Sequence, residues 1–192
     1  MADVSELIER LTGQDDAACE AEMIRLGQQG EEGLATLRAL LASDEVDARF
    51  WALRGLWANG SPEAVKLLIA ALEDEAEMVR SGAAFALGEL GSETAVEPLL
   101  RLLIDDASET GDHAADALAK IGQPAAAGLV EALQQAEAGV RVRAAWALVP
   151  IKSRQAIGPL FYALEDESYM VRHYAETALE RMGVGQMVYF RP

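Results

Sequence analysis

Residues 78–91 read Met-Val-Arg-Ser-Gly-Ala-Ala-Phe-Ala-Leu-Gly-Glu-Leu-Gly, and residues 170–183 read Met-Val-Arg-His-Tyr-Ala-Glu-Thr-Ala-Leu-Glu-Arg-Met-Gly. The pentapeptide Ala-Leu-Glu-Asp-Glu precedes both copies, at 71–75 and at 163–167. The copies lie 92 residues apart, which is three periods of about 31 residues, and related segments stand at 48–60, 111–122 and 140–152. A fixed period in this range indicates a repeat architecture.

Alignment of the five segments on the arginine of the quoted copies reveals columns that are typical of a buried helix face. The column three residues after the arginine holds only alanine, and the column seven residues after it holds only leucine: Ala52, Ala83, Ala114, Ala144, Ala175 and Leu56, Leu87, Leu118, Leu148, Leu179. The column six residues after it holds small residues: Gly55, Ala86, Ala117, Ala147 and Ala178. Each segment is therefore predicted to be a helix of about 12 residues, and glycine ends four of the five. Pro150 is expected to kink the fourth helix or to end it early.

A second helix per unit is predicted from leucines and valines at helical spacing between these segments. They are Leu34, Leu37, Leu41; Val65, Leu68, Leu72; Val96, Leu99, Leu103; Leu129, Leu133; and Ile157, Leu160, Leu164. An acidic turn follows this helix in most units, for example at 73–75 and 165–167. Residues 3–12 and 15–27 show a less regular helix pair, as expected of a terminal unit. The sequence therefore predicts an all-α protein of about six helix pairs.

The repeated Val-Arg and the pattern Ala-x-x-Ala-Leu-x-x-Leu-Gly resemble the short HEAT-like repeat of phycobilisome lyases over residues 30–183. Tetratricopeptide and ankyrin repeats have similar periods, but their signature residues are not present. The resemblance implies a right-handed α-solenoid, with residues 1–183 as one domain and residues 1–30 as its N-terminal capping pair. The apolar tail 184–192 is expected to cover the end of the array or to reach a second copy of the chain.

The charge balance argues against several classes of partner. The chain has 192 residues, with 32 Asp and Glu against 16 Lys and Arg and a formal charge of −16. This charge repels nucleic acid and anionic membranes, and no apolar stretch is long enough to span a bilayer. One cysteine and two histidines allow neither an internal disulfide nor a metal site built from Cys and His. We expect a cytoplasmic protein without metal or cofactor.

The repeated arginine column has a structural and a functional interpretation. The column comprises Arg49, Arg80, Arg141 and Arg172, with Gly111 in the third unit. A functional interpretation makes it a ladder of anion sites. The favoured interpretation has carboxylates of the acidic turns hold each arginine and bridge neighbouring units, as HEAT-like repeats generally show. Because the third unit lacks the arginine, residues 105–113 are predicted to be the least protected internal segment.

Catalytic motifs are weak in this sequence. His113 stands near Asp112, and Val171-Arg172-His173 resembles one motif of the HEAT-repeat di-iron hydroxylase, but Tyr174 follows where that enzyme has glutamate. There is no Gly-x-Ser-x-Gly and no phosphate-binding glycine loop. The sequence favours a non-enzymatic role.

The columns one, two and five residues after the arginine point away from the Ala/Leu stripe and hold two of the three Trp residues, two Phe residues, one Tyr residue and both His residues. The partner-binding residues predicted from these columns are Phe50, Trp51, Arg54, Phe85, Arg143, Trp146, His173 and Tyr174. Aromatic residues in line across successive units are typical of a concave binding groove. The favoured hypothesis is a protein-interaction scaffold that binds a protein or peptide there, with an acidic rim that favours basic partners. Burial of Phe50, Phe85 and Trp146 between helices remains open.

The family resemblance implies an alternative function. A bilin lyase-like or tetrapyrrole-binding subunit would hold an open-chain tetrapyrrole against the same aromatic residues. Arg54 and Arg143 would then meet its propionates, with His173 or Tyr174 near the ring system.

Overall fold

The structure is a computed structural model that describes residues 7–8, 11, 16–106, 108–135 and 137–184. Within these ranges all regular structure is helical, which confirms the all-α class. The chain divides into two compact units, residues 1–90 and 91–192, and each unit is described by itself. Most of the predicted helix 3–12 and almost all of the predicted tail 184–192 lie outside the described residues. In the part of the chain that is described, every helix is too short or too polar to cross a membrane.

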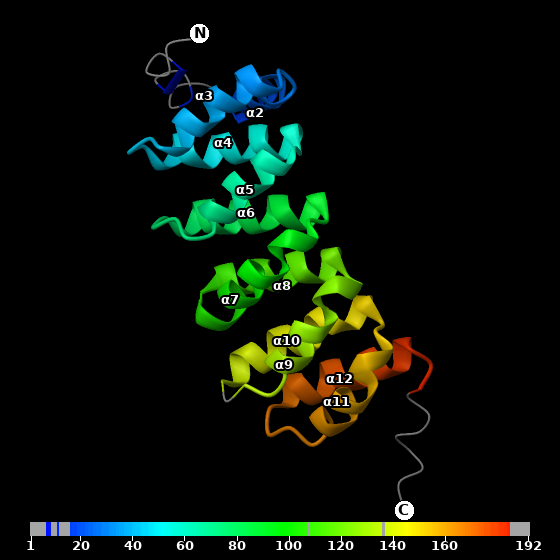
Figure 1. Cartoon of the computed structure of the whole chain (residues 1–192). Coiled ribbons are helices and arrows are strands. Elements are labelled where there is room, and N and C mark those ends of the chain that lie inside the picture. The colour runs from blue at the N-terminus through cyan, green and yellow to red at the C-terminus, as the bar shows by residue number, and fades with distance from the viewer. Residues whose placement is uncertain (1–6, 9–10, 12–15, 107, 136, 185–192) are drawn as a thin grey trace, which may run out of the picture. The chain divides into compact units, whose positions relative to one another are not determined.

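The first unit contains five described helices, α2 (Asp16–Gly27), α3 (Glu31–Leu41), α4 (Val46–Asn59), α5 (Pro62–Ala71) and α6 (Glu77–Leu90). Helix α4 packs against α2 on one side and against α6 on the other. Helix α3 packs on α4, and helix α5 packs on α6 and α4. Figure 1 shows these helices as successive layers, blue to green. The predicted repeat of one shorter and one longer helix is confirmed.

The second unit repeats this arrangement with three helix pairs. Its helices are α7 (Val96–Asp105), α8 (Glu109–Ile121), α9 (Ala126–Ala132), α10 (Ala138–Ile151), α11 (Ile157–Ala163) and α12 (Tyr169–Arg181). Each of the helices α7, α9 and α11 is preceded by its own 3-10 turn. Helix α10 packs between α8 and α12 (Figure 1). We call α3, α5, α7, α9 and α11 the A helices, and α4, α6, α8, α10 and α12 the B helices.

The core of both units is made by the alanine and leucine columns of the B helices. All ten of these residues are at most 1% exposed, so the spacing identified the buried face correctly. The small-residue column is buried as well, and at Gly55 the reason is steric. A Cβ atom there would lie 2.3 Å from Leu37 Cδ2 and 3.0 Å from the Met23 carbonyl oxygen. Small residues in this column therefore allow neighbouring helices to approach closely.

The B helices end in a left-handed residue, which favours glycine. Gly60, Gly91, Gly122 and Gly183 have φ between 60° and 84°. The fourth B helix ends instead at Lys152, with φ 53° and ψ 40°. Pro150 does not end this helix early, because α10 continues to Ile151, and the alternative expectation of a kink at Pro150 stays a prediction. Pro150 lies in the last turn, where its missing N–H costs one hydrogen bond only.

We predict that Lys152→Gly stabilises the chain by about 1 kcal/mol, because glycine adopts left-handed geometry without the steric cost of a Cβ atom. Urea unfolding followed by circular dichroism measures the change. Lys152→Ala is the matched control, since it removes the charged side chain but keeps the Cβ atom, and it should give no gain. An equal gain in both variants would show that the lysine side chain, and not the backbone, is the source of strain.

Candidate functional site

Two arginines of the repeated column hold the acidic turn of the following helix pair in the same geometry. The Arg49 guanidinium donates to both carboxylate oxygens of Asp74 (2.9 and 3.0 Å), and that of Arg141 donates to both oxygens of Asp166 (2.7 and 3.0 Å). These arginine side chains are only 7% and 10% exposed. Each aspartate also accepts the backbone N–H of the residue two positions later. One carboxylate therefore closes its own turn and connects it to the preceding B helix.

The same arginines also satisfy carbonyl groups of their own unit. The third guanidinium nitrogen, Nη1, donates to backbone carbonyls of the turn that precedes the helix. Arg49 donates to the carbonyls of Ser43 and Asp44, and Arg141 donates to the carbonyl of Gln135. The Nη1 atoms of Arg80 and Arg172 donate to the two equivalent carbonyls of their own turns. This guanidinium-to-carbonyl contact is common to all four arginines of the column.

The charge pairing shifts the pKa values of both partners. The hydrogen bond from Arg141 is the main reason that the pKa of Asp166 lies below its usual range, although burial opposes it. For Asp74, burial is the largest influence and would raise the pKa, but the bonds from Arg49 and from the Ala76 N–H together outweigh it and lower the pKa. A carboxyl with a lowered folded-state pKa stabilises the fold above its unfolded pKa of about 3.9, and this contribution disappears as the pH falls through the folded-state value.

We predict that Arg141→Ala destabilises the chain by about 3 kcal/mol at pH 7, because it leaves a mostly buried carboxylate without its cation. Urea unfolding at several pH values measures the effect. The difference from the wild type should shrink as the pH is lowered from 7 toward 3 and Asp166 takes up its proton. Arg38→Ala is the control: it breaks an exposed pair with Glu63 and should cost less than about 0.5 kcal/mol. Equal costs for the two variants would contradict a structural role for the repeated arginine.

The third helix pair obtains its arginine from the next pair. Gly111 stands in the arginine column of α8, and the guanidinium of Arg143 from α10 occupies the space beside it, where a Cβ atom would lie 2.7 Å from Arg143 Cζ. Arg143 donates to the carbonyls of Leu103, Asp106 and Ser108 and to the Asp112 carboxylate (2.7 Å). The turn between α7 and α8 is therefore held by an arginine although its own unit has none.

We predict that Arg143→Ala accelerates amide hydrogen exchange in residues 103–110 by at least tenfold, because three carbonyls of this turn lose their donor. Hydrogen exchange followed by mass spectrometry measures it. Arg143→Lys should recover only part of the protection, since a single ammonium group does not reproduce the fork of a guanidinium. Unchanged exchange in Arg143→Ala would show that the turn is held by its other contacts.

In the first unit, four of the predicted partner-binding residues lie close to one another on α4 and α6. The rings of Phe50 and Trp51 meet edge to face with centroids 5.7 Å apart. The Arg54 guanidinium lies 5.7 Å from the centre of the Phe85 ring, and its Nε is 3.9 Å from a Glu20 carboxylate oxygen. Phe50 is half-buried against Gly82, whereas Phe85 is 41% exposed. The structure thus gives Phe50 a packing role and leaves a face of Phe85 open to solvent.

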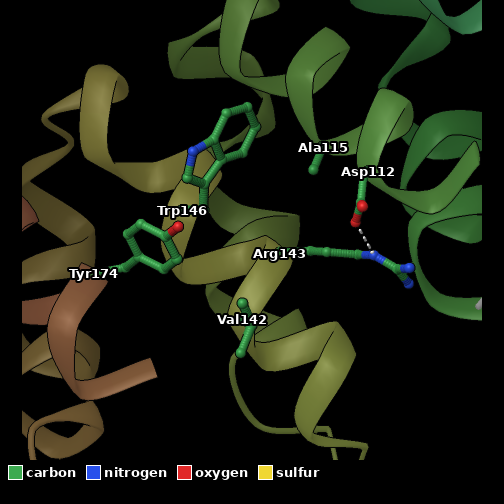
Figure 2. A pocket seen from close by; sticks show the side chains of 6 residues that line it. All are labelled: Asp112, Ala115, Val142, Arg143, Trp146 and Tyr174. Atoms are coloured by element: carbon green, nitrogen blue, oxygen red, sulfur yellow. Dashed lines mark hydrogen bonds and ion pairs between the residues drawn. The ribbon is translucent and has the colours of Figure 1, made fainter. Parts of the chain in front are cut away.

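In the second unit, side chains of the B helices line an open hollow of about 300 Å³. Asp112, Ala115, Val142, Arg143, Trp146 and Tyr174 line it. Figure 2 shows Trp146 and Tyr174 beside each other, with the Arg143 guanidinium turned away from them toward Asp112. Trp146 is 37% exposed. The structure therefore brings together three of the predicted residues, and only two of them offer an open aromatic surface.

His173 lies next to this hollow in an aromatic cluster at the start of α12. Its ring stacks on Tyr169 with centroids 6.1 Å apart and meets the Tyr174 ring at 5.3 Å. The Arg172 guanidinium lies over the Tyr169 ring, with its Cζ atom 5.9 Å from the ring centroid. Tyr169, the exposed first residue of α12, is not among the predicted residues, because it stands outside the columns one, two and five residues after the arginine.

The geometry bears on the tetrapyrrole alternative as well. Arg54 is engaged by Phe85 and Glu20, and Arg143 is engaged by the α7–α8 turn, so both guanidinium groups assigned to propionates already have contacts. The hollow is at the lower limit of pockets for drug-sized molecules. Among the described residues, no group of three or more His, Cys, Asp or Glu residues is placed to hold a metal ion.

Comparison with known proteins agrees with the repeat pattern. A profile of HEAT repeats matches residues 34–119, 67–139 and 126–187. Among curated proteins, none matches this chain significantly.

Several solved structures share the fold. An archaeal HEAT-like repeats protein from Thermococcus onnurineus NA1 is 15% identical with a TM-score of 0.62, over 95% of this chain and 81% of that one. The complex of CpcE and CpcF of phycocyanin lyase from Nostoc sp. PCC7120 is 23% identical with a TM-score of 0.53, over 95% and 78%. A designed armadillo repeat protein in complex with the peptide (KR)4 is 21% identical with a TM-score of 0.52, over 94% and 100%. These likenesses establish the solenoid fold.

Proposed function

Because the chain belongs to the HEAT-repeat family, we propose that it is a protein-interaction module whose B-helix surfaces bind a protein or a peptide. The helix pairs form the scaffold, and repeat proteins of this kind expose equivalent helix faces at regular intervals. The B-helix surface consists, in this proposal, of the predicted residues Phe50, Trp51, Arg54 and Phe85 in the first unit and Arg143, Trp146, His173 and Tyr174 in the second.

The observation that carries the proposal is the exposure of large aromatic side chains at the same repeat position. Phe85 and Trp146 both stand five residues after the arginine column, and both keep a large part of their surface open to solvent. Burying such rings in water-excluded contacts is a main source of binding energy in protein interfaces. The alanine and leucine columns of the same helices are fully buried, whereas Phe85 and Trp146 lie outside these columns and are 41% and 37% exposed.

The charge of the chain favours basic partners. A formal charge of −16 over 192 residues attracts cationic segments and accelerates their association. A designed protein of the same fold forms a complex with a peptide of alternating lysine and arginine, which supports an acidic solenoid as a receptor for basic segments.

We predict that Trp146→Ala weakens binding of a selected peptide by about 2 kcal/mol, or roughly thirtyfold, because it removes a central aromatic anchor. Peptides are selected from a random dodecamer display library on the full chain, and fluorescence anisotropy measures their affinity. Tyr162→Ala is the matched control: Tyr162 is 81% exposed but lies on the A helix α11 of the same unit, so its removal should leave affinity unchanged. A loss in Tyr162→Ala with none in Trp146→Ala would place the site on the A helices.

A further inference from the structure

The first unit shows how this protein itself covers an aromatic ring on the B-helix surface. Arg54 and Phe85 occupy the same repeat position, five residues after the arginine column, on the neighbouring helices α4 and α6. The guanidinium of one lies 5.7 Å from the ring centre of the other, within the distance of a cation–π contact. The carboxylate of Glu20 lies 3.9 Å from the same guanidinium. A ring, a cation and a carboxylate thus form one assembly.

In the second unit, the same repeat position holds an aromatic ring on one helix, but on the preceding helix it holds a carboxylate where the first unit has the guanidinium. Trp146 of α10 corresponds to Phe85, and the residue of the preceding helix α8 that corresponds to Arg54 is Asp116. Asp112 lies one helical turn before Asp116, lines the hollow, and has a side chain that is 69% exposed. The nearby Arg143 guanidinium does not take the missing place, because it points toward the α7–α8 turn (Figure 2).

The size and lining of the hollow restrict what fits. Its volume of about 300 Å³ accommodates a single long side chain more readily than a folded element. Trp146 and Tyr174 supply aromatic faces, Val142 supplies an apolar contact for an aliphatic stem, and the Asp112 carboxylate, which is paired with Arg143, lies at the rim. Arginine matches this set because its planar guanidinium stacks on aromatic rings and pairs with carboxylates.

We propose that the hollow between α8, α10 and α12 binds one arginine side chain of a partner protein, stacked on Trp146 and paired with the carboxylates of Asp112 and Asp116. The partner's arginine completes in the second unit the assembly that Arg54 completes in the first. Both carboxylates already have a cation of their own, since Arg143 lies 2.7 Å from Asp112 and Lys120 lies 2.9 Å from Asp116, so the partner's arginine would share each carboxylate with that cation. This inference rests on the proposed function, because it assumes that the B-helix surface is the one that meets a partner.

The test uses two octapeptides on the full chain labelled with 15N. One alternates lysine and arginine, and the other alternates glutamine and citrulline, which keeps similar shapes without the charge. The readout is the indole N–H resonance of Trp146, assigned by its loss in Trp146→Phe. We expect the charged peptide to shift this resonance in a saturable manner and the neutral peptide to leave it in place. An unmoved resonance with the charged peptide, or equal shifts with both peptides, overturns the inference.

Variants separate stacking from general attraction to an acidic surface. Trp146→Leu keeps an apolar side chain but removes the aromatic face, and it should weaken the charged peptide at least tenfold, as should Asp112→Asn together with Asp116→Asn. Tyr162→Ala should change affinity less than twofold. Wild-type affinity in Trp146→Leu overturns the stacking. Melting temperatures of the variants show whether a loss of affinity reflects unfolding. Asp116→Asn alone leaves the Asp112–Arg143 pair intact, and it gives a smaller loss of affinity than the double variant if the carboxylates contact the peptide directly.

The peptide selection distinguishes failure of this inference from failure of the proposed function. If selected peptides need Trp146 but contain no enriched arginine, the B-helix surface is still the binding surface and the arginine site is wrong. If no peptide or protein depends on the B-helix residues, both fall together. Enrichment of arginine that disappears in a selection on Trp146→Leu supports both.

Discussion

The bidentate bond from a B-helix arginine to the aspartate of the next acidic turn is the contact on which the regular stacking depends. It appears in nearly the same geometry at Arg49–Asp74 and at Arg141–Asp166. Each aspartate also closes its own turn, so the bond sets where the next B helix begins as well as how it is held. Apolar columns alone would permit sliding of one helix along another, because hydrophobic contact is not directional. Fork-to-carboxylate geometry removes that freedom.

The third helix pair shows that the requirement lies in the turn and not in a particular residue of the pattern. Gly111 has no side chain to offer, and Arg143 reaches the turn from the following helix. Its guanidinium contacts turn carbonyls as the column arginines do, although the aspartate it meets, Asp112, lies in the helix and not in the turn. Because Arg143 takes the place of the missing column arginine, its stem lines the hollow while its guanidinium points away from the hollow toward Asp112 (Figure 2).

The helix pairs and their buried faces followed from the sequence because the columns repeat five times, and each alanine and leucine reports the same environment. The ends of four B helices could be predicted from their glycines. The fourth B helix ends at Lys152, where the backbone keeps the same left-handed geometry although no glycine is present. The contribution of Arg143 to the α7–α8 turn could not be read from its own column, since its cause is a missing side chain 32 residues earlier. The exposure of Tyr162 was equally hidden, because the A helix α11 is only seven residues long and gives too little periodicity to separate its faces.

Arg143 lines the hollow and also donates to the carbonyls of Leu103, Asp106 and Ser108, so the binding of a ligand in the hollow, as proposed, would be thermodynamically linked to the order of the turn. A ligand that draws Asp112 away from Arg143 leaves the guanidinium held by carbonyls alone and softens the turn, and a ligand that stacks without disturbing the pair does not. By reciprocity, if binding in the hollow changes the order of the turn, a change that orders the turn alters the affinity of the hollow by the same coupling free energy. The absent side chain at Gly111 thereby connects the hollow between α8, α10 and α12 to the turn between α7 and α8.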